Sequence, residues 1–173
     1  MQRNSLSVIS KLIEVLPAFY ESVAAQRLDK VAAGMHGRLA TTGVGKSGYV
    51  ARKVASTFAT IGLHARFMHP TEALHGELGS ISPDEDILVF SAGGETQELY
   101  RLLDNIEEDR VILFTANSQS GLPHRTMLLV PHIEEAPPVI SSVLLQLLGD
   151  GLALEFARCW PQDFKRFHPG YRR

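Results

Sequence analysis

The chain has 173 residues, 45% hydrophobic and 21% charged, which is the composition of an ordinary globular domain and excludes a disordered or fibrous chain. A formal net charge of −2 provides no broad field for nucleic acid or an anionic membrane, so we expect neither as a partner. The single cysteine, Cys159, excludes an internal disulfide and a cysteine-based zinc cluster. Its position in a late apolar segment predicts a buried side chain.

The N-terminal sequence MQRNSLSVISKLIEV alternates polar and apolar residues and lacks the apolar stretch of a signal peptide. The sequence contains no run of 18 apolar residues, so we expect no membrane-spanning segment. We therefore expect a cytoplasmic protein.

Apolar residues at helical spacing predict N-terminal helices over residues 5–33, with a kink or a break at Pro17. Between about 37 and 131, short apolar runs alternate with amphipathic segments and predict the sheet core. The expected strands lie in GRLATTG, HARFMH, DILVFS, RVILFTA and TMLLV. Residues 70–83 are punctuated by Pro and Gly and predict a loop with one helical turn, and a long apolar helix is expected over about 139–159.

Strands that are continuous apolar runs alternating with helices are typical of a parallel sheet covered on both faces. We predict one α/β domain over residues 1–173, a three-layer α/β/α sandwich with a five-stranded parallel, flavodoxin-like sheet. In such folds the ligand crevice lies at the carboxyl ends of the strands. The turns that follow the strands are therefore where binding residues are expected.

The glycine-rich turn Gly43–Gly48, with the sequence GVGKSG, admits three interpretations. A P-loop requires a glycine six positions before its lysine, and that position holds Ala40. A dinucleotide site requires an acidic residue at the end of the next strand, and that strand ends in FMH, with Arg66 as a weak substitute for a 2′-phosphate partner. The third interpretation is a strand-to-helix turn that binds a small sugar phosphate.

A second turn, Ser91–Thr96, favours the third interpretation. It follows the third expected strand and offers two hydroxyls, and Gly93 and Gly94 allow backbone N–H groups to face a ligand. The start of the next helix adds a partial positive charge. Two such turns on neighbouring strands would hold one small phosphorylated molecule without nucleotide machinery.

Four motifs are spread over most of the chain: Gly43–Gly48, HPTEALHGELG at His69–Gly79, Ser91–Thr96, and Phe167–Gly170. With these motifs the chain resembles the SIS (sugar isomerase) domain family, most closely its arabinose-5-phosphate isomerases of the KpsF/GutQ type. The resemblance implies a single five-stranded SIS domain and a homo-oligomer, commonly a tetramer or dimer of dimers, with active sites shared between subunits. It also implies a small sugar phosphate as substrate.

Aldose–ketose isomerisation moves a proton between C1 and C2 through an enediolate, which needs a base, an oxyanion-stabilising group and a phosphate anchor. We expect no metal or other cofactor. The resemblance assigns catalytic roles to Lys46, His75, Glu98, Glu135 and His168. It assigns substrate or phosphate binding to Gly45, Lys46, Ser47, Glu77, Ser91, Gly93, Gly94 and Thr96.

Several of these assignments have alternatives. Ser47, Ser91 and Thr96 have the residue types of ordinary helix caps, and Glu134 competes with Glu135 for its alignment. His69, Glu72 and His75 have a spacing that would gather around a metal on one helix face, but the adjoining proline and loop composition disfavour that face.

Three features depart from the family pattern. Gly93 stands where the strand-three turn, S-x-S-G-E-[ST], usually has a second serine. The loop before the last helix is shortened to EEAPPVISS and retains Ser141 and Ser142 as hydroxyls. Finally, the chain ends without the paired CBS domains of longer members, so regulation through them is not expected.

The expected function is conversion of arabinose 5-phosphate to ribulose 5-phosphate. Two alternatives stay open. One is another SIS isomerase, a 6-phospho-3-hexuloisomerase or a phosphoheptose isomerase. The other is a non-catalytic protein that binds or senses a phosphosugar.

Overall fold

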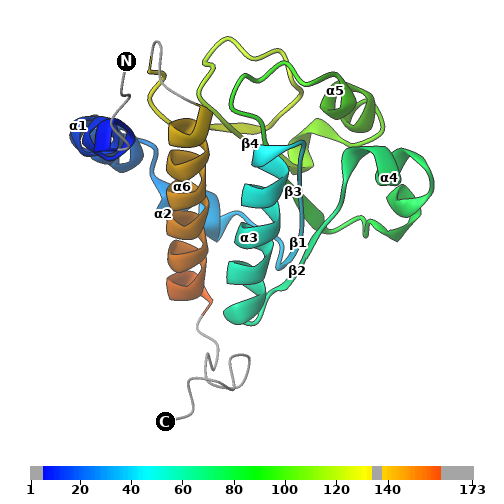
Figure 1. Cartoon of the computed structure of the whole chain (residues 1–173). Helices are drawn as coiled ribbons and strands as arrows, with labels where there is room; N and C mark the ends of the chain where they lie inside the picture. Colours follow the sequence, from blue (N-terminus) through cyan, green and yellow to red (C-terminus); the bar gives the residue numbers. More distant parts are fainter. Residues whose placement is uncertain (1–5, 134–137, 161–173) are drawn as a thin grey trace.

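A computed structural model describes residues 6–133 and 138–160 and contains one five-stranded sheet with helices on both faces (Figure 1). The strands are β1 (Arg38–Gly43), β2 (His64–Phe67), β3 (Glu85–Phe90), β4 (Val111–Thr115) and β5 (Thr126–Leu129). They run in the order β2-β1-β3-β4-β5, and every neighbouring pair is parallel. This is the flavodoxin-like α/β sandwich that the alternating pattern predicts.

The helices form two layers of unequal size. One layer contains α1 (Leu6–Ala25), α2 (Leu28–Ala33), α3 (Lys46–Thr60) and α6 (Pro138–Cys159). The other contains α4 (Pro70–Leu74) and α5 (Gln97–Leu103), with the short 3₁₀ helices η1 (Glu77–Ser80) and η2 (Glu108–Arg110) in the adjoining connections. Figure 1 shows α3 and α6 side by side over the sheet.

The central strands are buried on both faces because each helix layer covers one face of the sheet. Leu88, Phe90 and Phe114 pack toward α3 and α6, and the Phe90 and Phe114 rings stack at 4.4 Å between centroids. The alternate residues Ile87 and Val89 pack toward α5. This alternation is the period-two geometry of a strand, and it explains why these strands are continuous apolar runs in the sequence.

The two N-terminal helices are separated after Ala25 and not at Pro17. Pro17 lies inside the continuous helix α1 and is exposed, and so is Ile13, whose carbonyl loses its N–H partner to the proline. The break comes instead at Arg27, whose φ of 51° is left-handed and ends the helical path before α2.

The expectation of a buried Cys159 is wrong, because the side chain is exposed at the last residue of α6. The last core residue of that helix is Phe156, one turn earlier. Helix α6 is also long and apolar enough to cross a membrane by composition alone. Its apolar character has a local cause, because Leu144, Leu148 and Leu152 are fully buried against the sheet and its neighbouring helices.

A buried carboxylate ties three segments together at the amino ends of the strands. Asp86, the second residue of β3, is fully buried and accepts hydrogen bonds from the backbone N–H of His36 at 2.7 Å and from the Arg125 guanidinium at 2.9 Å. The Nδ1 atom of His36 lies 3.1 Å from the carboxylate oxygen that Arg125 also contacts. Asp86 thereby joins the segments that lead into β1 and β5 to the centre of the sheet.

Candidate active site

The turn between β1 and α3 is built on glycines that no other residue can replace without movement. A Cβ on Gly43 would lie 2.8 Å from the carbonyl oxygen of Phe90, and a Cβ on Gly48 would lie 2.7 Å from that of Gly43. Gly45, with a φ of 58°, is the N-cap of α3 and provides no side-chain cap. The N–H groups of the first turn of α3 therefore face the carboxyl edge of the sheet without a side-chain acceptor. Lys46 opens the helix there and is exposed.

The turn between β3 and α5 is organised by a pair of hydroxyls. Ser91 is buried, and its Oγ accepts a hydrogen bond from the N–H of Gly94 at 3.2 Å and lies 3.0 Å from Oγ1 of Thr96. Thr96 occupies the N-cap position of α5 but makes no side-chain cap. The helix-cap interpretation of these residues therefore does not describe their hydrogen bonds, which instead gather two hydroxyls beside a glycine turn.

The two turns leave the sheet side by side, because Gly43 of β1 pairs with Phe90 of β3. A third hydroxyl belongs to this region. Thr42 precedes Gly43, and its Oγ1 is buried without a hydrogen-bond partner among the described residues. The neighbouring Thr41 donates to the carbonyl of Ala51 in α3, so Thr42 points to the opposite face, the one that α5 covers.

A cleft of about 630 Å³ opens at this carboxyl edge, between the β3 turn and the start of α6. Its volume is that of a small-molecule site. Its lining comes from three connections and from α6, namely Ala92, Gly93, Glu95, Ala116, Asn117, Ser118, His132, Ile133, Pro138 and Ser141.

The structure brings together one part of the predicted site. Ser91, Gly93, Gly94 and Thr96 form one turn, and Gly93 lines the cleft. Gly45, Lys46 and Ser47 lie in the adjoining β1 turn, outside the lining of the cleft.

The remaining predicted residues are absent from the lining of the cleft or lie outside the described residues. His75 and Glu77 are exposed on the α4–η1 connection beyond β2, and Glu98 is exposed in the first turn of α5. Glu135 and His168, together with the competing Glu134, lie outside the described residues. The roles of all five predicted catalytic residues stay predictions.

The structure does not gather His69, Glu72 and His75 into the alternative metal site. The Nδ1 atom of His69 accepts a hydrogen bond from the N–H of Thr71 at 3.3 Å and so caps α4. Within residues 6–133 and 138–160, no three His, Cys, Asp or Glu side chains are grouped to hold a metal ion.

Sequence reasoning missed the residues that support the β3 turn from the next connection. The side-chain amide of Asn117 donates to the carbonyl of Gly93 at 2.9 Å, and the hydroxyl of Ser120 donates to that of Gly94 at 2.7 Å. It also missed Glu95 and His132 in the lining. Asn117 and His132 follow β4 and β5, so their positions just after buried strands were the available signal.

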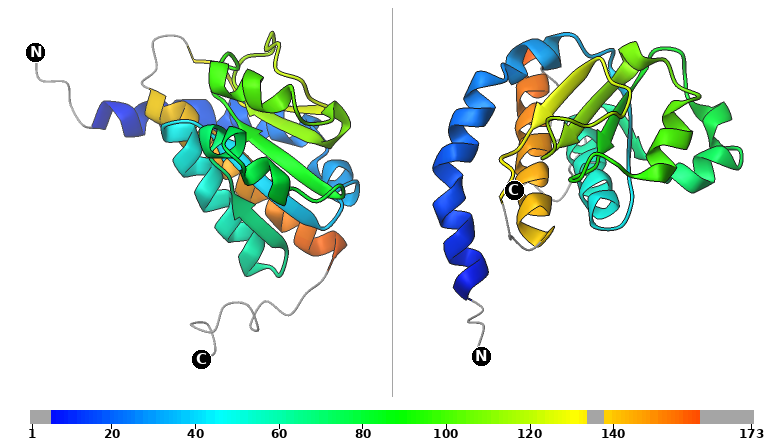
Figure 2. Two further views of the ribbon diagram at one scale, coloured as in Figure 1. Left: turned by 90° about the vertical axis from the view of Figure 1, so that its right-hand side faces the viewer. Right: turned by 90° about the horizontal axis from the view of Figure 1, so that it is seen from above.

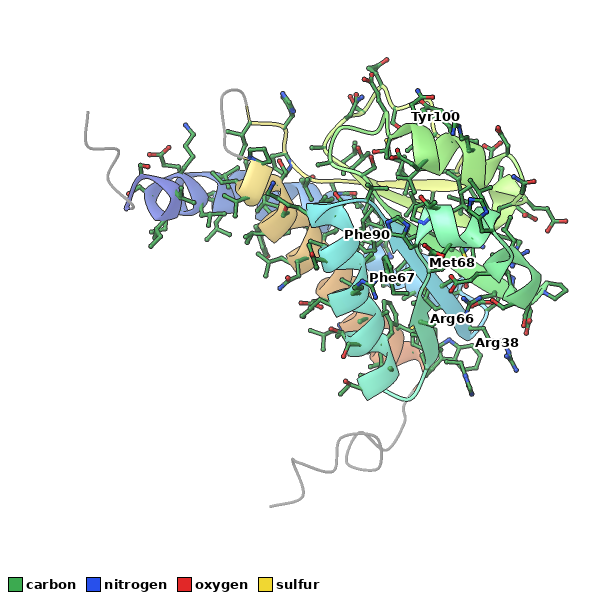
Figure 3. The ribbon with its side chains drawn as sticks, turned by 45° about the vertical axis from the view of Figure 1, so that its right-hand side comes forward. Arg38, Arg66, Phe67, Met68, Phe90 and Tyr100 are labelled. Atoms are coloured by element: carbon green, nitrogen blue, oxygen red, sulfur yellow. The ribbon has the colours of Figure 1, made fainter. Side chains whose placement is uncertain are left out.

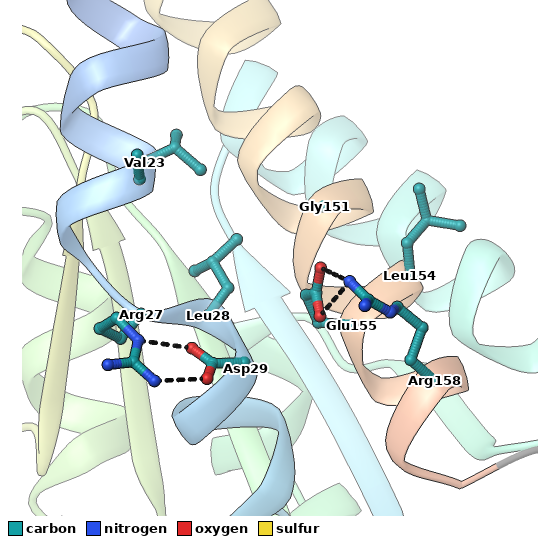
Figure 4. A pocket seen from close by; sticks show the side chains of 9 residues that line it. Val23, Arg27, Leu28, Asp29, Gly151, Leu154, Glu155 and Arg158 are labelled. Atoms are coloured by element: carbon teal, nitrogen blue, oxygen red, sulfur yellow. Dashed lines mark hydrogen bonds and ion pairs between the residues drawn. The ribbon is translucent and has the colours of Figure 1, made fainter.

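A second hollow, of about 560 Å³, lies between the α1–α2 junction and α6 (Figure 4). Its charged groups are paired with one another: Arg27 with Asp29 at 2.7 Å and Arg158 with Glu155 at 3.0 Å. The hydrogen bond from Arg27 lowers the pKa of Asp29 to about 2. Because each cation in this hollow already holds a carboxylate, the hollow is a poorer anion site than the carboxyl edge.

The geometry also disfavours a dinucleotide. Arg66, the weak candidate for a 2′-phosphate partner, pairs with the buried Glu85 at 3.2 Å, at the amino end of β3. Figure 3 shows Arg38 and Arg66 together at that end of the sheet, away from Phe90. Fold and site together define an α/β sandwich with two adjacent turns that can hold one small anion.

Comparison with known proteins places the chain more narrowly. The SIS domain model matches residues 35–150, and the chain belongs to the SIS domain family. It is 34% identical over 97% of its length to the arabinose 5-phosphate isomerase KpsF of Escherichia coli O6:H1, of which the match covers 55%. It is also 34% identical, over 97% of its length, to a probable arabinose 5-phosphate isomerase of Haemophilus influenzae, of which the match covers 53%.

The chain is also similar to solved structures. A protein of E. coli CFT073 in complex with arabinose 5-phosphate superposes with a TM-score of 0.73 at 30% identity, covering 96% of this chain and 100% of that one. A putative phosphosugar isomerase of Bacteroides fragilis shares the fold, with a TM-score of 0.76 at 24% identity, covering 93% of this chain and 95% of that one. The chain spans about half the length of the curated relatives it matches.

Proposed function

We propose that the protein is a phosphosugar aldose–ketose isomerase that converts arabinose 5-phosphate to ribulose 5-phosphate. The observation that carries the proposal is that two turns with groups suited to bind an anion, Gly43–Gly48 and Ser91–Thr96, leave neighbouring strands. The match to arabinose 5-phosphate isomerases over nearly the whole of this chain supports this substrate.

In this proposal the phosphate is held by the hydroxyls of Ser91 and Thr96 and by the backbone N–H groups of the Ser91–Thr96 turn. A carboxylate, Glu98 or Glu135, takes the proton from C2 of the aldose and returns it to C1 of the enediolate. Lys46 opens α3 at the adjacent turn and stabilises the negative enediolate oxygen. Each of these residues supplies a group that the reaction requires.

We also propose that the active site is shared between subunits of a cytoplasmic homo-oligomer. His75 and Glu77 lie beyond β2, and the described residues of one chain do not bring them to the cleft. A second subunit would supply the missing groups, His75 or His168 among them.

A non-catalytic phosphosugar sensor is the second candidate function. It is favoured by Gly93, which removes one hydroxyl from the phosphate turn, and by the position of Lys46 and Glu98 outside the cleft lining. Binding needs only the two turns, whereas turnover also needs the base.

A coupled assay for ketose formation tests the proposal with a panel of C5 to C7 aldose phosphates. We expect turnover of arabinose 5-phosphate above that of the other members. Turnover of a hexose or heptose phosphate instead would assign a different SIS isomerase. Saturable binding, measured by calorimetry, without turnover of any member would establish the sensor.

Replacing Gly93 with Ser is expected to lower the KM for the phosphosugar about ten-fold, because a hydrogen bond to a charged group contributes about 1.5–3 kcal/mol. A Cβ at Gly93 meets no atom within 4 Å, so the side chain fits without rearrangement. Steady-state kinetics with the preferred substrate measure the change.

The matched control is Gly94→Ser in the same turn. A Cβ there would lie 2.6 Å from the Cβ of Ser120, on a backbone with a φ of 67°, so this variant should bind the sugar phosphate less well. An unchanged KM in Gly93→Ser would mean that the phosphate does not contact this position.

A further inference from the structure

Three consecutive carbonyls of the Ser91–Thr96 turn accept hydrogen bonds from side chains at the end of β4 and in the connection that follows it. These bonds run from Thr115 to Ala92 at 3.3 Å, from Asn117 to Gly93 at 2.9 Å and from Ser120 to Gly94 at 2.7 Å. Figure 2 shows the connections that follow β3 and β4 next to each other. We call the three donor side chains the carbonyl clamp.

The donors of the carbonyl clamp are themselves fixed in orientation. Oδ1 of Asn117 accepts a hydrogen bond from the N–H of Gln119 at 2.9 Å, which turns the amide nitrogen of the same side chain toward the turn. The hydroxyl of Ser120 accepts a hydrogen bond from the N–H of Leu122 at 3.3 Å, so its own proton is directed to the turn. The clamp is therefore built before any ligand binds.

The clamp decides which side of each peptide faces a ligand. The described residues contain no cis peptide bond, and in a trans peptide the N–H points away from the C=O. The carbonyls point toward the β4 connection, so the N–H groups that share their peptides, those of Gly93, Gly94 and Glu95, point away from it. Because β3 lies between β4 and β1, that is the side of the Gly43–Gly48 turn.

Two of these three N–H groups are available to an anion. The N–H of Gly94 is bonded within the turn, to Oγ of Ser91 at 3.2 Å. Those of Gly93 and Glu95 have no acceptor in the described part of the chain, and both residues are exposed. A turn with two glycines can otherwise rotate a peptide and present its carbonyl, which repels an anion. The clamp holds the turn against that rotation.

We propose that Thr115, Asn117 and Ser120 are positioning residues, which hold the β3 turn in the orientation in which the N–H groups of Gly93 and Glu95 bind the phosphate of the substrate. The inference rests on the proposed function, because it names the backbone donors for the phosphate of that substrate. It adds the reason why these donors point toward the ligand. The clamp thereby acts on the affinity for the anion and not only on the fold.

Inorganic phosphate, titrated into the ¹⁵N-labelled 173-residue chain and followed in ¹H–¹⁵N correlation spectra, tests the proposal. In the parent, the amide signals of Gly93 and Glu95 should shift with one common Kd. Ser120→Ala releases the peptide between Gly94 and Glu95, so phosphate should bind about three- to ten-fold more weakly, and the Glu95 shift should shrink more than the Gly93 shift. Ser120 is absent from the lining of the cleft, so its loss removes no direct contact there.

The matched control is Ser22→Ala, because the Ser22 hydroxyl also donates to a backbone carbonyl, that of Leu129 at 3.3 Å. This variant should leave the Kd for phosphate unchanged. Asn117→Ala is a second test, with Asn105→Ala as its control, since both amides donate to backbone carbonyls at 2.9 Å. Asn117→Ala should weaken phosphate binding and speed the hydrogen exchange of the Gly94 amide, and Asn105→Ala should do neither.

Failure of the inference and failure of the proposed function give different results. A parent chain that binds phosphate while the Gly93 and Glu95 signals stay unmoved would overturn the inference alone. An unchanged Kd in both Ser120→Ala and Asn117→Ala would do the same. A parent chain that binds neither phosphate nor arabinose 5-phosphate would overturn the proposed function, and the inference with it.

Discussion

Replacing Glu135 with Gln is expected to lower kcat for arabinose 5-phosphate by a factor of about 10²–10⁴, the usual contribution of a general base. The isosteric amide keeps the shape of the side chain and removes its ability to accept a proton. His132, Ile133 and Pro138 line the cleft, and Glu135 lies between them in the sequence. We therefore expect the larger loss at Glu135 and a smaller one at Glu98, which is exposed on α5 outside the lining.

The matched control for this prediction is Glu134→Gln, which makes the same replacement of a carboxylate by an amide at the adjacent residue. Its kcat should stay within a few-fold of the parent value. Single-turnover measurements separate the proton-transfer step from product release. If Glu98→Gln abolished turnover while Glu135→Gln did not, the base would be Glu98. If neither variant changed a measurable kcat, carboxylate catalysis at these two positions would be wrong.

The fold could be predicted because its signals are local in the sequence. Continuous apolar runs such as ILVF at β3 follow from burial on both faces. In the Gly43–Gly48 turn, Gly43 and Gly48 follow from backbone approaches below 3 Å, and Gly45 follows from its positive φ. The position of the ligand edge then follows from the parallel topology alone. The strands and helices need only neighbouring residues and the periodicity of the sequence, whereas the close approach of Gly43 to Phe90 joins residues that are distant in the sequence.

The candidate site could be predicted only in part, because its walls come from segments that are distant in sequence. The Ser91–Thr96 turn was readable, but its support by Asn117 and Ser120 depends on how two connections meet above the sheet. The burial of residues at a helix end was also difficult to predict. At Cys159 the apolar pattern of the sequence continues one turn beyond Phe156, the last core residue of the helix.

Replacing Asp86 with Ala is expected to lower the free energy of unfolding by about 3 kcal/mol, since removing one partner of a buried charge pair leaves the other uncompensated. The carboxylate is fully buried, and its loss leaves the N–H of His36 and Nη2 of Arg125 without their acceptor, while Nη1 of Arg125 keeps its hydrogen bond to the carbonyl of Asp109. The value is at the lower end of the range for buried pairs because the Arg125 side chain is 23% exposed and can regain water. Urea unfolding followed by circular dichroism measures the change.

Asp84→Ala provides the comparison, two residues earlier on the same end of the sheet. Asp84 lies 3.7 Å from Arg38 with both side chains more than half exposed, so this variant should lose less than about 1 kcal/mol. Asp86 lies at the amino end of β3, whereas the two ligand turns lie at the carboxyl ends, so the folded fraction of Asp86→Ala should retain the parent KM. Equal stabilities of the two variants would show that the buried carboxylate does not join β1, β3 and β5. A change in KM at unchanged stability would place Asp86 in communication with the site, against the separation of the two ends of the sheet.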